Sequence, residues 1–168
     1  MLGGKLWVES EEGAGSQFYF TLPIKGQSEE KLIDIKSVSA ELLENRIKQL
    51  NVLIVEDIFE SSKYLEIIVR PFANVIIKAG TGVEAVAACQ NNPDIDLVLM
   101  DIQLPEMSGY EAVLEIRKFN PEVVIIAQTA YAQRGDREKA IAAGCNDYLA
   151  KPISKTDLMA LINSYFGE

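Results

Sequence analysis

The sequence predicts an α/β fold in which one parallel sheet is covered by helices on both faces. From residue 51 onward, short apolar runs alternate with amphipathic stretches of helical length, which is the pattern of strands joined by helical crossovers. We expect strands near 51–55, 74–78, 96–100, 123–128 and 146–150. We expect helices near 59–71, 82–91, 108–119, 134–143 and 155–166. This succession predicts a doubly wound five-stranded sheet with the strand order 2-1-3-4-5, counted from residue 51.

Residues that stop helices lie where this pattern needs them. Pro71 lies at the end of the first predicted helix, and Pro93 precedes the third strand. Asn120-Pro121 and Gly144 follow the third and fourth helices. These residues support the boundaries drawn from the hydrophobic pattern.

The first 50 residues have a different pattern. Residues 5–9 and 16–23 alternate between polar and apolar side chains around a Gly-containing turn, so residues 1–24 are expected to form a β-hairpin. A lone hairpin is marginal in water, which suggests that it derives from a larger sheet. Residues 25–50 are predicted to be a partly helical linker, and residues 51–168 the main domain.

The composition excludes several classes of function. The net charge of −9 argues against a nucleic-acid-binding surface, and no apolar stretch approaches the roughly 20 residues of a membrane-spanning helix. Cys89 and Cys145 form no CxxC pair, so we expect reduced thiols that pack as small hydrophobic groups. Because the chain has no histidine, any phosphohistidine must come from another domain or protein.

Reactive side chains follow four of the predicted strands. Glu56 and Asp57 follow the first strand, Asp101 ends the third, and Thr129 and Lys151 follow the fourth and fifth. The carboxyl ends of parallel strands share one edge of a sheet, so we expect these groups to meet there. Three neighbouring acids repel one another unless a cation compensates them, and Mg²⁺ prefers such oxygen ligands. The alternative is that Glu56 and Asp57 merely cap the following helix.

Asp101 is the candidate nucleophile of this cluster. A carboxylate can attack a phosphorus atom and form an acyl phosphate. Lys151 offers an ammonium group to the phosphoryl oxygens, and Thr129 offers a hydroxyl donor. Lys151 precedes Pro152, and we expect a constrained turn there, with a cis bond as one form, that holds the amine in place.

Residues 51–168 resemble the receiver domain of two-component response regulators, which has a flavodoxin-like fold. The resemblance rests on four segments: Glu56-Asp57, the run from Met100 to Gly109, Thr129-Ala130, and the run from Tyr148 to Pro152. It implies that Asp101 accepts a phosphoryl group from a phosphohistidine, carried by a histidine kinase or a histidine phosphotransfer domain. It also implies that Mg²⁺ is bound by Glu56, Asp57, Asp101 and the backbone carbonyl of Gln103.

The same resemblance assigns roles to other residues of the predicted site. Lys151 would contact the phosphoryl group, while Thr129 and Tyr148 would move together when it arrives and change the surface formed by residues 134–166. Pro105 and Gly109 would shape the loop after the nucleophile, with Pro152 in the loop after Lys151. The small Ala130 would leave access to the nucleophile.

Two positions near the site are expected to modify its behaviour. Ile58 stands where receivers of hybrid kinases often carry Asn, which leaves the metal ligands unchanged but affects how the partner docks. Tyr131 lies near the path of attacking water in this family, and its bulk is predicted to slow the loss of the phosphoryl group. The lifetime of that group should therefore change in Tyr131→Ala.

The N-terminal hairpin resembles the end of the ATP-binding domain of sensor histidine kinases. The matching residues are Gly3, Gly4, Leu6, Val8, Ser10, Gly13, Gly15, Ser16, Phe18 and Phe20. The magnesium, adenine and lid motifs of that domain are missing from the sequence, so the fragment is not expected to bind ATP. The two resemblances together imply the receiver of a hybrid histidine kinase, in the cytoplasm even where the parent kinase is anchored in a membrane.

Three other functions fit parts of the pattern. A phosphatase of the aspartyl-phosphate type needs a DxD motif, and Asp101-Ile102-Gln103 lacks the second acid. A flavin- or nucleotide-binding protein needs a first loop that cradles phosphate, which Glu56-Asp57 would repel. A receiver-like module that only docks usually lacks an acid or the lysine, whereas this sequence has the complete set, and docking alone is kept as the alternative. Whether the chain is an enzyme also stays open, because a receiver catalyses only its own phosphorylation and dephosphorylation.

Overall fold

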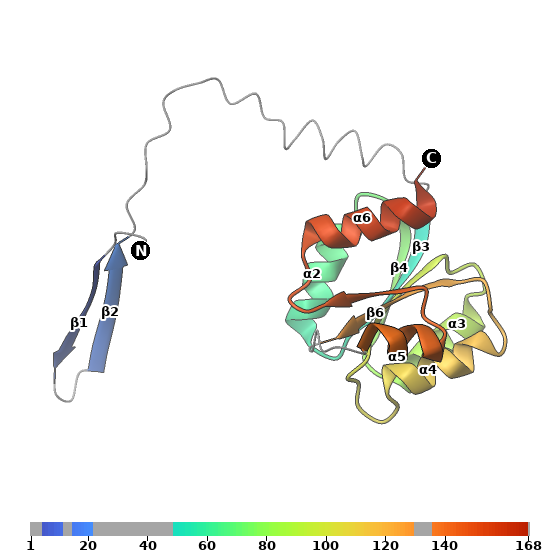
Figure 1. Cartoon of the computed structure of the whole chain (residues 1–168), viewed down its shortest axis with the longest axis horizontal. Coiled ribbons are helices and arrows are strands. Elements are labelled where there is room, and N and C mark those ends of the chain that lie inside the picture. Colours follow the sequence, from blue (N-terminus) through green and yellow to red (C-terminus); the bar gives the residue numbers. More distant parts are fainter. Residues whose placement is uncertain (1–4, 12–14, 22–48, 130–135, 168) are drawn as a thin grey trace, which may run out of the picture. The chain divides into compact units, whose positions relative to one another are not determined.

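The chain divides into two units, Met1–Lys36 and Ser37–Glu168, each of which is described here by itself (Figure 1). The computed structural model describes residues 5–11, 15–21, 49–129 and 136–167. The predicted linker helix near 39–49, Ala130 and Tyr131 therefore fall largely or wholly outside the described residues.

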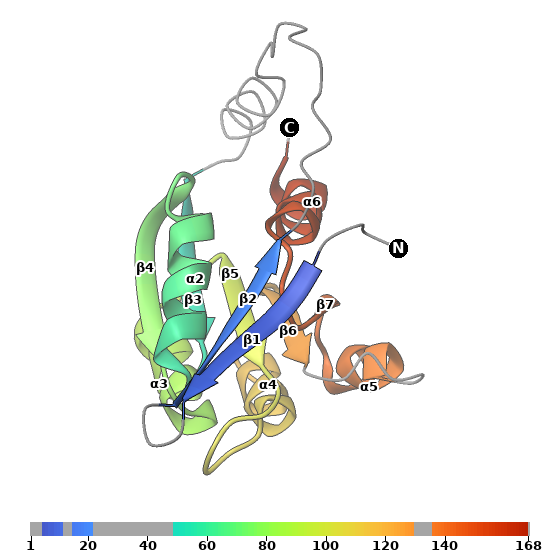
Figure 2. The same ribbon diagram turned by 90° about the vertical axis from the view of Figure 1, so that its left-hand side faces the viewer.

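The second unit contains a parallel sheet of five strands in the order β4-β3-β5-β6-β7, and Figure 2 shows the strands following one another in this order. The strands are β3 (Leu50–Val55), β4 (Ala73–Ala79), β5 (Leu97–Asp101), β6 (Val124–Thr129) and β7 (Asp147–Ala150). Every neighbouring pair in this sheet is parallel. The flavodoxin-like order 2-1-3-4-5 predicted from the sequence is confirmed.

Helices cover both faces of this sheet (Figure 1). They are α2 (Phe59–Val69), α3 (Gly82–Asn91), α4 (Gly109–Arg117), α5 (Asp136–Ala143) and α6 (Lys155–Phe166). One hydrophobic cluster joins the sheet to α3, α4 and α5, and a second joins it to α2 and α6. The predicted doubly wound architecture therefore has a core on each side of the sheet.

The central strand β5 shows why these apolar runs form a sheet that is buried on both faces. All five of its residues are buried. Because side chains alternate along a strand, Val98 and Met100 pack in the α3–α4–α5 cluster, while Leu97 and Leu99 pack in the α2–α6 cluster. Each such side chain contributes roughly 1.5–3 kcal/mol by leaving water. A continuous apolar run is thus what a central parallel strand requires.

Three helices begin at a side chain that caps their backbone. The Thr81 side chain accepts a hydrogen bond from Glu84 N at the start of α3, and the Ser154 side chain does so from Asp157 N at the start of α6. At α4, Ser108 accepts from the backbone N–H of the third helical residue, whose side chain accepts in turn from Ser108 N. Such reciprocal capping satisfies N–H groups that have no partner within the helix.

The first unit is a two-stranded antiparallel hairpin, as the sequence predicts, made of β1 (Lys5–Glu11) and β2 (Gly15–Thr21). Trp7 faces Tyr19 across the strands, and the two rings stack with centroids 5.3 Å apart. Val8 faces Phe18, and these side chains are 51% and 75% exposed.

Among the described helices of the whole chain, none is both long and apolar enough to cross a membrane.

Candidate functional site

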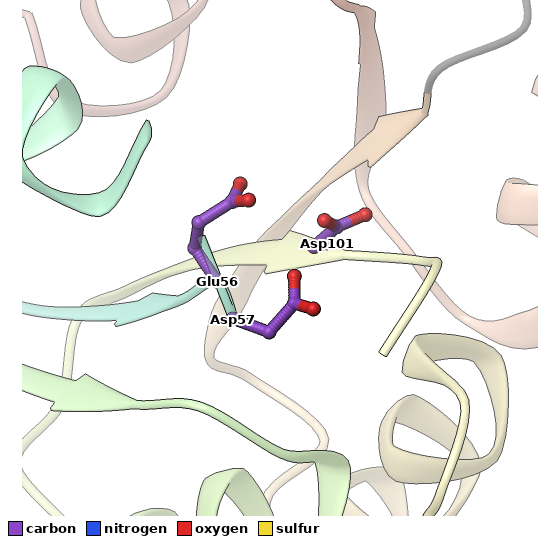
Figure 3. Close-up of side chains that lie close together, drawn as sticks. All are labelled: Glu56, Asp57 and Asp101. Atoms are coloured by element: carbon purple, nitrogen blue, oxygen red, sulfur yellow. The ribbon is translucent and has the colours of Figure 1, made fainter. Parts of the chain in front are cut away.

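Three carboxylates meet at the carboxyl edge of the sheet, as expected (Figure 3). Glu56 and Asp57 directly follow β3, and Asp101 is the last residue of the neighbouring strand β5. One oxygen of each carboxylate lies within 4.8 Å of one oxygen of each other carboxylate. Strand adjacency therefore brings Asp101 beside two acids that precede it by 44 and 45 residues in the sequence.

The three acids differ in their surroundings. Glu56 and Asp101 are 4% and 3% exposed, whereas Asp57 is exposed to solvent. Lys151 follows β7, and its ammonium Nζ donates to Glu56 Oε2 at 2.7 Å and to Asp101 Oδ2 at 2.6 Å. The lysine thus compensates the two buried acids, while water solvates the third.

The pKa values of this group follow from burial and pairing. Burial raises the pKa of Glu56, the hydrogen bond from Lys151 opposes this, and the charge of Asp101 adds to the rise. Burial alone would lower the pKa of Lys151, but its hydrogen bonds to Asp101 and Glu56 outweigh burial and raise that pKa. Lys151 is therefore firmly protonated at neutral pH and provides a fixed positive charge beside Asp101.

The backbone holds the Asp101 carboxylate in place from the other side. Gln103 N donates to Asp101 Oδ1 at 2.9 Å, and Ile102 N donates to Gln128 O of the adjacent strand at 3.0 Å. Gly109, at the start of α4, lies directly against this turn: a Cβ there would fall 2.1 Å from Asp101 O. Only glycine permits this contact, so the predicted role of Gly109 in shaping the loop has a steric basis.

The remaining predicted residues lie on β6 and β7 and in the nearby loops. Thr129 ends β6, is 7% exposed, and accepts through its backbone carbonyl from Lys151 N at 2.7 Å. The Lys151–Pro152 bond is cis. Tyr148 on β7 is half-buried and packs against the α3–α4–α5 cluster. Pro105 is exposed in the loop after Asp101.

Sequence reasoning missed one polar residue of this edge, Gln128. It lies on β6 opposite Asp101, is 1% exposed, and neither of its side-chain amide atoms has a hydrogen-bond partner among the described residues. The available signal was a single amide side chain directly after the apolar run from Val123 to Ala127.

Comparison with known proteins supports the same interpretation of the fold. A family model described as the response regulator receiver domain matches residues 52–163. This chain belongs to that family. The matched residues begin within β3, end within α6 and include all the strands and helices between them.

The chain is similar to a curated sensor kinase and to a solved receiver domain. The autoinducer 2 sensor kinase/phosphatase LuxQ of Vibrio vulnificus is 33% identical over 160 residues, covering 94% of this chain and 18% of that protein. The receiver domain of Saccharomyces cerevisiae Ssk1, solved with the histidine phosphotransfer protein Ypd1, is 34% identical with a TM-score of 0.67, covering 71% of this chain and 90% of that chain.

A third similar structure contains a metal ion. The receiver domain of the Pseudomonas aeruginosa sensor histidine kinase PA1611, solved with magnesium coordinated in its active site cleft, is 36% identical with a TM-score of 0.63. The match covers 70% of this chain and 97% of that chain. Several curated relatives are far longer, and this chain spans between 4% and 28% of their length.

Proposed function

We propose that this receiver domain takes a phosphoryl group from a phosphohistidine onto Asp101. An Asp101 carboxylate oxygen attacks the phosphorus, the P–O bond forms as the P–N bond breaks, and the leaving imidazole takes up a proton. The observation that carries the proposal is the position of Asp101 between the Lys151 ammonium, the Gln103 N–H and two further acids.

The charges of the cluster fit a divalent cation. Three carboxylates and one ammonium leave a formal charge of −2, which one Mg²⁺ would neutralise. We infer that Glu56, Asp57, Asp101 and the Gln103 backbone carbonyl would hold the ion. When bound, Mg²⁺ would supply positive charge to the phosphoryl oxygens.

Residues of the chain would stabilise the transferred phosphoryl group and carry its effect to the surface. Lys151 has a flexible stem and already contacts Asp101 Oδ2, so its ammonium can follow the phosphoryl oxygens as they arrive. Phosphorylation adds roughly two negative charges, which offer a new acceptor to the Thr129 hydroxyl. Tyr148 packs beneath the same edge, and we infer that it turns inward when Thr129 moves, which changes the α5–β7–α6 surface.

The partner would be a histidine kinase or a histidine phosphotransfer protein. Ssk1, a similar receiver domain, was solved with such a protein. In this chain Ile58 and Phe59 are 52% and 73% exposed and directly follow the acid pair. Exposed apolar side chains beside a charged site are suited to docking a partner that must bring its histidine to Asp101.

We also propose that the chain comes from a hybrid histidine kinase. Residues 1–24 would be the end of its ATP-binding domain, 25–50 a linker and 51–168 the receiver domain, all on the cytoplasmic side. Two observations support this: the similarity to LuxQ covers 94% of the chain, and the hairpin exposes Val8 and Phe18, which a complete sheet would cover.

The central proposal is tested by incubating the chain with Mg²⁺ and acetyl phosphate and measuring the intact mass. We expect one phosphoryl adduct that is lost in Asp101→Asn. Asp157→Asn, at the exposed start of α6, is the matched control and should keep the adduct. No adduct on the unmodified chain, or one that survives Asp101→Asn, would instead favour a receiver-like module that only docks.

A further inference from the structure

A pocket of about 690 Å³ lies beside the acid cluster, between α2 and the loop after β7. This volume is within the usual range for small-molecule sites. Its described lining residues come from α2, from the ends of β3 and β6 and from the loop after β7: Glu56, Glu60, Ser61, Tyr64, Leu65, Gln128, Lys151, Pro152 and Ile153.

Two buried polar side chains in this lining have unused hydrogen-bonding atoms. Gln128 Oε1 and Nε2 and Glu56 Oε1 are all buried, and none has a partner among the described residues. Buried polar atoms of folded proteins are nearly always paired, so each exception calls for an explanation. The preceding β6 residues Ile126 and Ala127 are buried apolar side chains. No hydrogen bond to a described residue accounts for the Gln128 amide at the end of this apolar stretch.

We propose that this pocket binds a small organic cation with an apolar body, such as an aryl amidinium. Its N–H donors would pair with Glu56 Oε1 and Gln128 Oε1, the two unused acceptors. The apolar body would lie against Leu65 and Ile153. None of these contacts involves the phosphoacceptor Asp101.

The charges around the pocket favour a cation over an anion. Glu56 and Glu60 provide two negative charges, and Lys151 provides the one positive charge of the described lining. That ammonium is already shared between Glu56 Oε2 and Asp101 Oδ2, so little of its charge is available to the pocket. A ligand that donates to a carboxylate gains a charge-assisted hydrogen bond, which is among the stronger kinds.

The wall of the pocket is also fixed before any ligand arrives. The Tyr64 hydroxyl of α2 donates to Ile153 O at 3.1 Å, which joins the helix to the loop after Pro152. Binding therefore does not have to order these two elements first, which lowers its entropic cost.

Occupation of this pocket would regulate the acid cluster, because both sites use Glu56. A cation bound to Glu56 Oε1 competes with Mg²⁺ for the same carboxylate, so each ligand should weaken the other by the same factor, about fivefold or more. This coupling rests on the proposed function, whereas binding to the pocket does not.

Benzamidine is a suitable probe, followed by NMR titration of the whole chain without Mg²⁺. We expect saturable shifts of the Gln128 side-chain amide and of the Ile153 methyl groups. Gln128→Leu should weaken binding about tenfold or more, because it removes a hydrogen-bond acceptor for a charged donor. Glu60→Gln, an exposed change that cannot disturb the core, should weaken binding by a smaller factor.

Two controls separate this site from general binding. Gln90→Leu, on an exposed face of α3, should leave the affinity for benzamidine unchanged, and neutral benzamide should bind more weakly than benzamidine. The proposal is overturned if the shifts do not saturate or if Gln128→Leu binds as well as the unmodified chain. Acetyl phosphate labelling of Asp101 is measured separately, so failure of the pocket and failure of the phosphoacceptor role are distinguishable.

Discussion

Replacing Gly109 with alanine should damage both the fold and the phosphoacceptor edge. The added Cβ would lie 2.1 Å from Asp101 O and 2.8 Å from Ile102 Cα, and both are backbone atoms that no side-chain rotation can move. To reach an ordinary contact of 3.4 Å, the start of α4 and the end of β5 would have to separate by about 1.3 Å. That movement would also break the 3.0 Å hydrogen bond from Gly109 N to Ile102 O.

The cost of this separation can be estimated from its parts. Forcing extra volume into a packed region costs about 1–3 kcal/mol, and the lost hydrogen bond adds about 1 kcal/mol. We therefore expect Gly109→Ala to lower the free energy of unfolding by about 2–4 kcal/mol. Because the shifted backbone carries Asp101, a displacement of about 1 Å should also slow phosphorylation up to roughly 100-fold.

Urea unfolding and the rate of acetyl phosphate labelling measure these two effects. Gly80→Ala is the matched control, because a Cβ at Gly80 would meet only the Glu84 carboxylate at an ordinary 3.6 Å. Its stability should be unchanged or raised by up to about 1 kcal/mol. If Gly109→Ala unfolds at the same urea concentration as Gly80→Ala, the steric argument for this turn is refuted.

Three further changes test other parts of the molecule. Lys151→Met should tighten Mg²⁺ binding several-fold in calorimetry, because it removes the ammonium that competes with the ion for Glu56 and Asp101. The same change should slow phosphorylation. An unchanged affinity for Mg²⁺ would contradict the proposed competition. Arg117→Met removes hydrogen bonds to five acceptors and should cost about 2–5 kcal/mol in urea unfolding, with exposed Lys118→Met as a nearly neutral control. Hydrogen bonds from Lys78, Lys63 and Arg70 lower the pKa of Glu66 to about 2. Above pH 4.5, Glu66→Gln should therefore unfold at a lower urea concentration than the unmodified chain. This difference should shrink as the pH falls toward 2, because the Glu66 carboxylate then becomes protonated.

The order of the strands and the meeting of the acids could be predicted because both follow from local patterns and one topological rule. The apolar runs and their spacing gave five strands whose observed limits differ from the predicted ones by one residue at most. Two helices were predicted to be too long, because α2 ends at Val69 and not at residue 71, and α4 ends at Arg117 and not at residue 119. At α2, Pro71 has no N–H and so cannot continue the helical hydrogen bonding, although Arg70 before it keeps a helical conformation.

The contacts made by long polar side chains could not be predicted in the same way. Arg117 donates hydrogen bonds to the backbone carbonyls of Val123, just before β6, and Gly144, before β7. It also donates to the side chain of Asn146, which is distant in the sequence. Glu66 of α2 forms an ion pair with Lys78 of strand β4, as well as with Lys63 of its own helix and Arg70 at the end of that helix. Such side chains have many rotamers, and only the assembled fold selects one of them.

The pairing within the acid cluster explains how buried acids can be stable at this edge. From the sequence alone, a metal ion was expected to relieve the repulsion among the three acids. In the structure Lys151 pairs with both buried acids, Glu56 and Asp101, and only Asp57, which is exposed to water, has no contact with the lysine. The two Asp101 oxygens then differ in freedom. Oδ1 is held by the Gln103 backbone N–H, which moves only with the chain, whereas Oδ2 is held by an ammonium on a flexible stem. Oδ2 is therefore the oxygen whose partner can turn away without rearranging the fold, and under the proposed function we expect it to be the one that attacks the phosphorus atom.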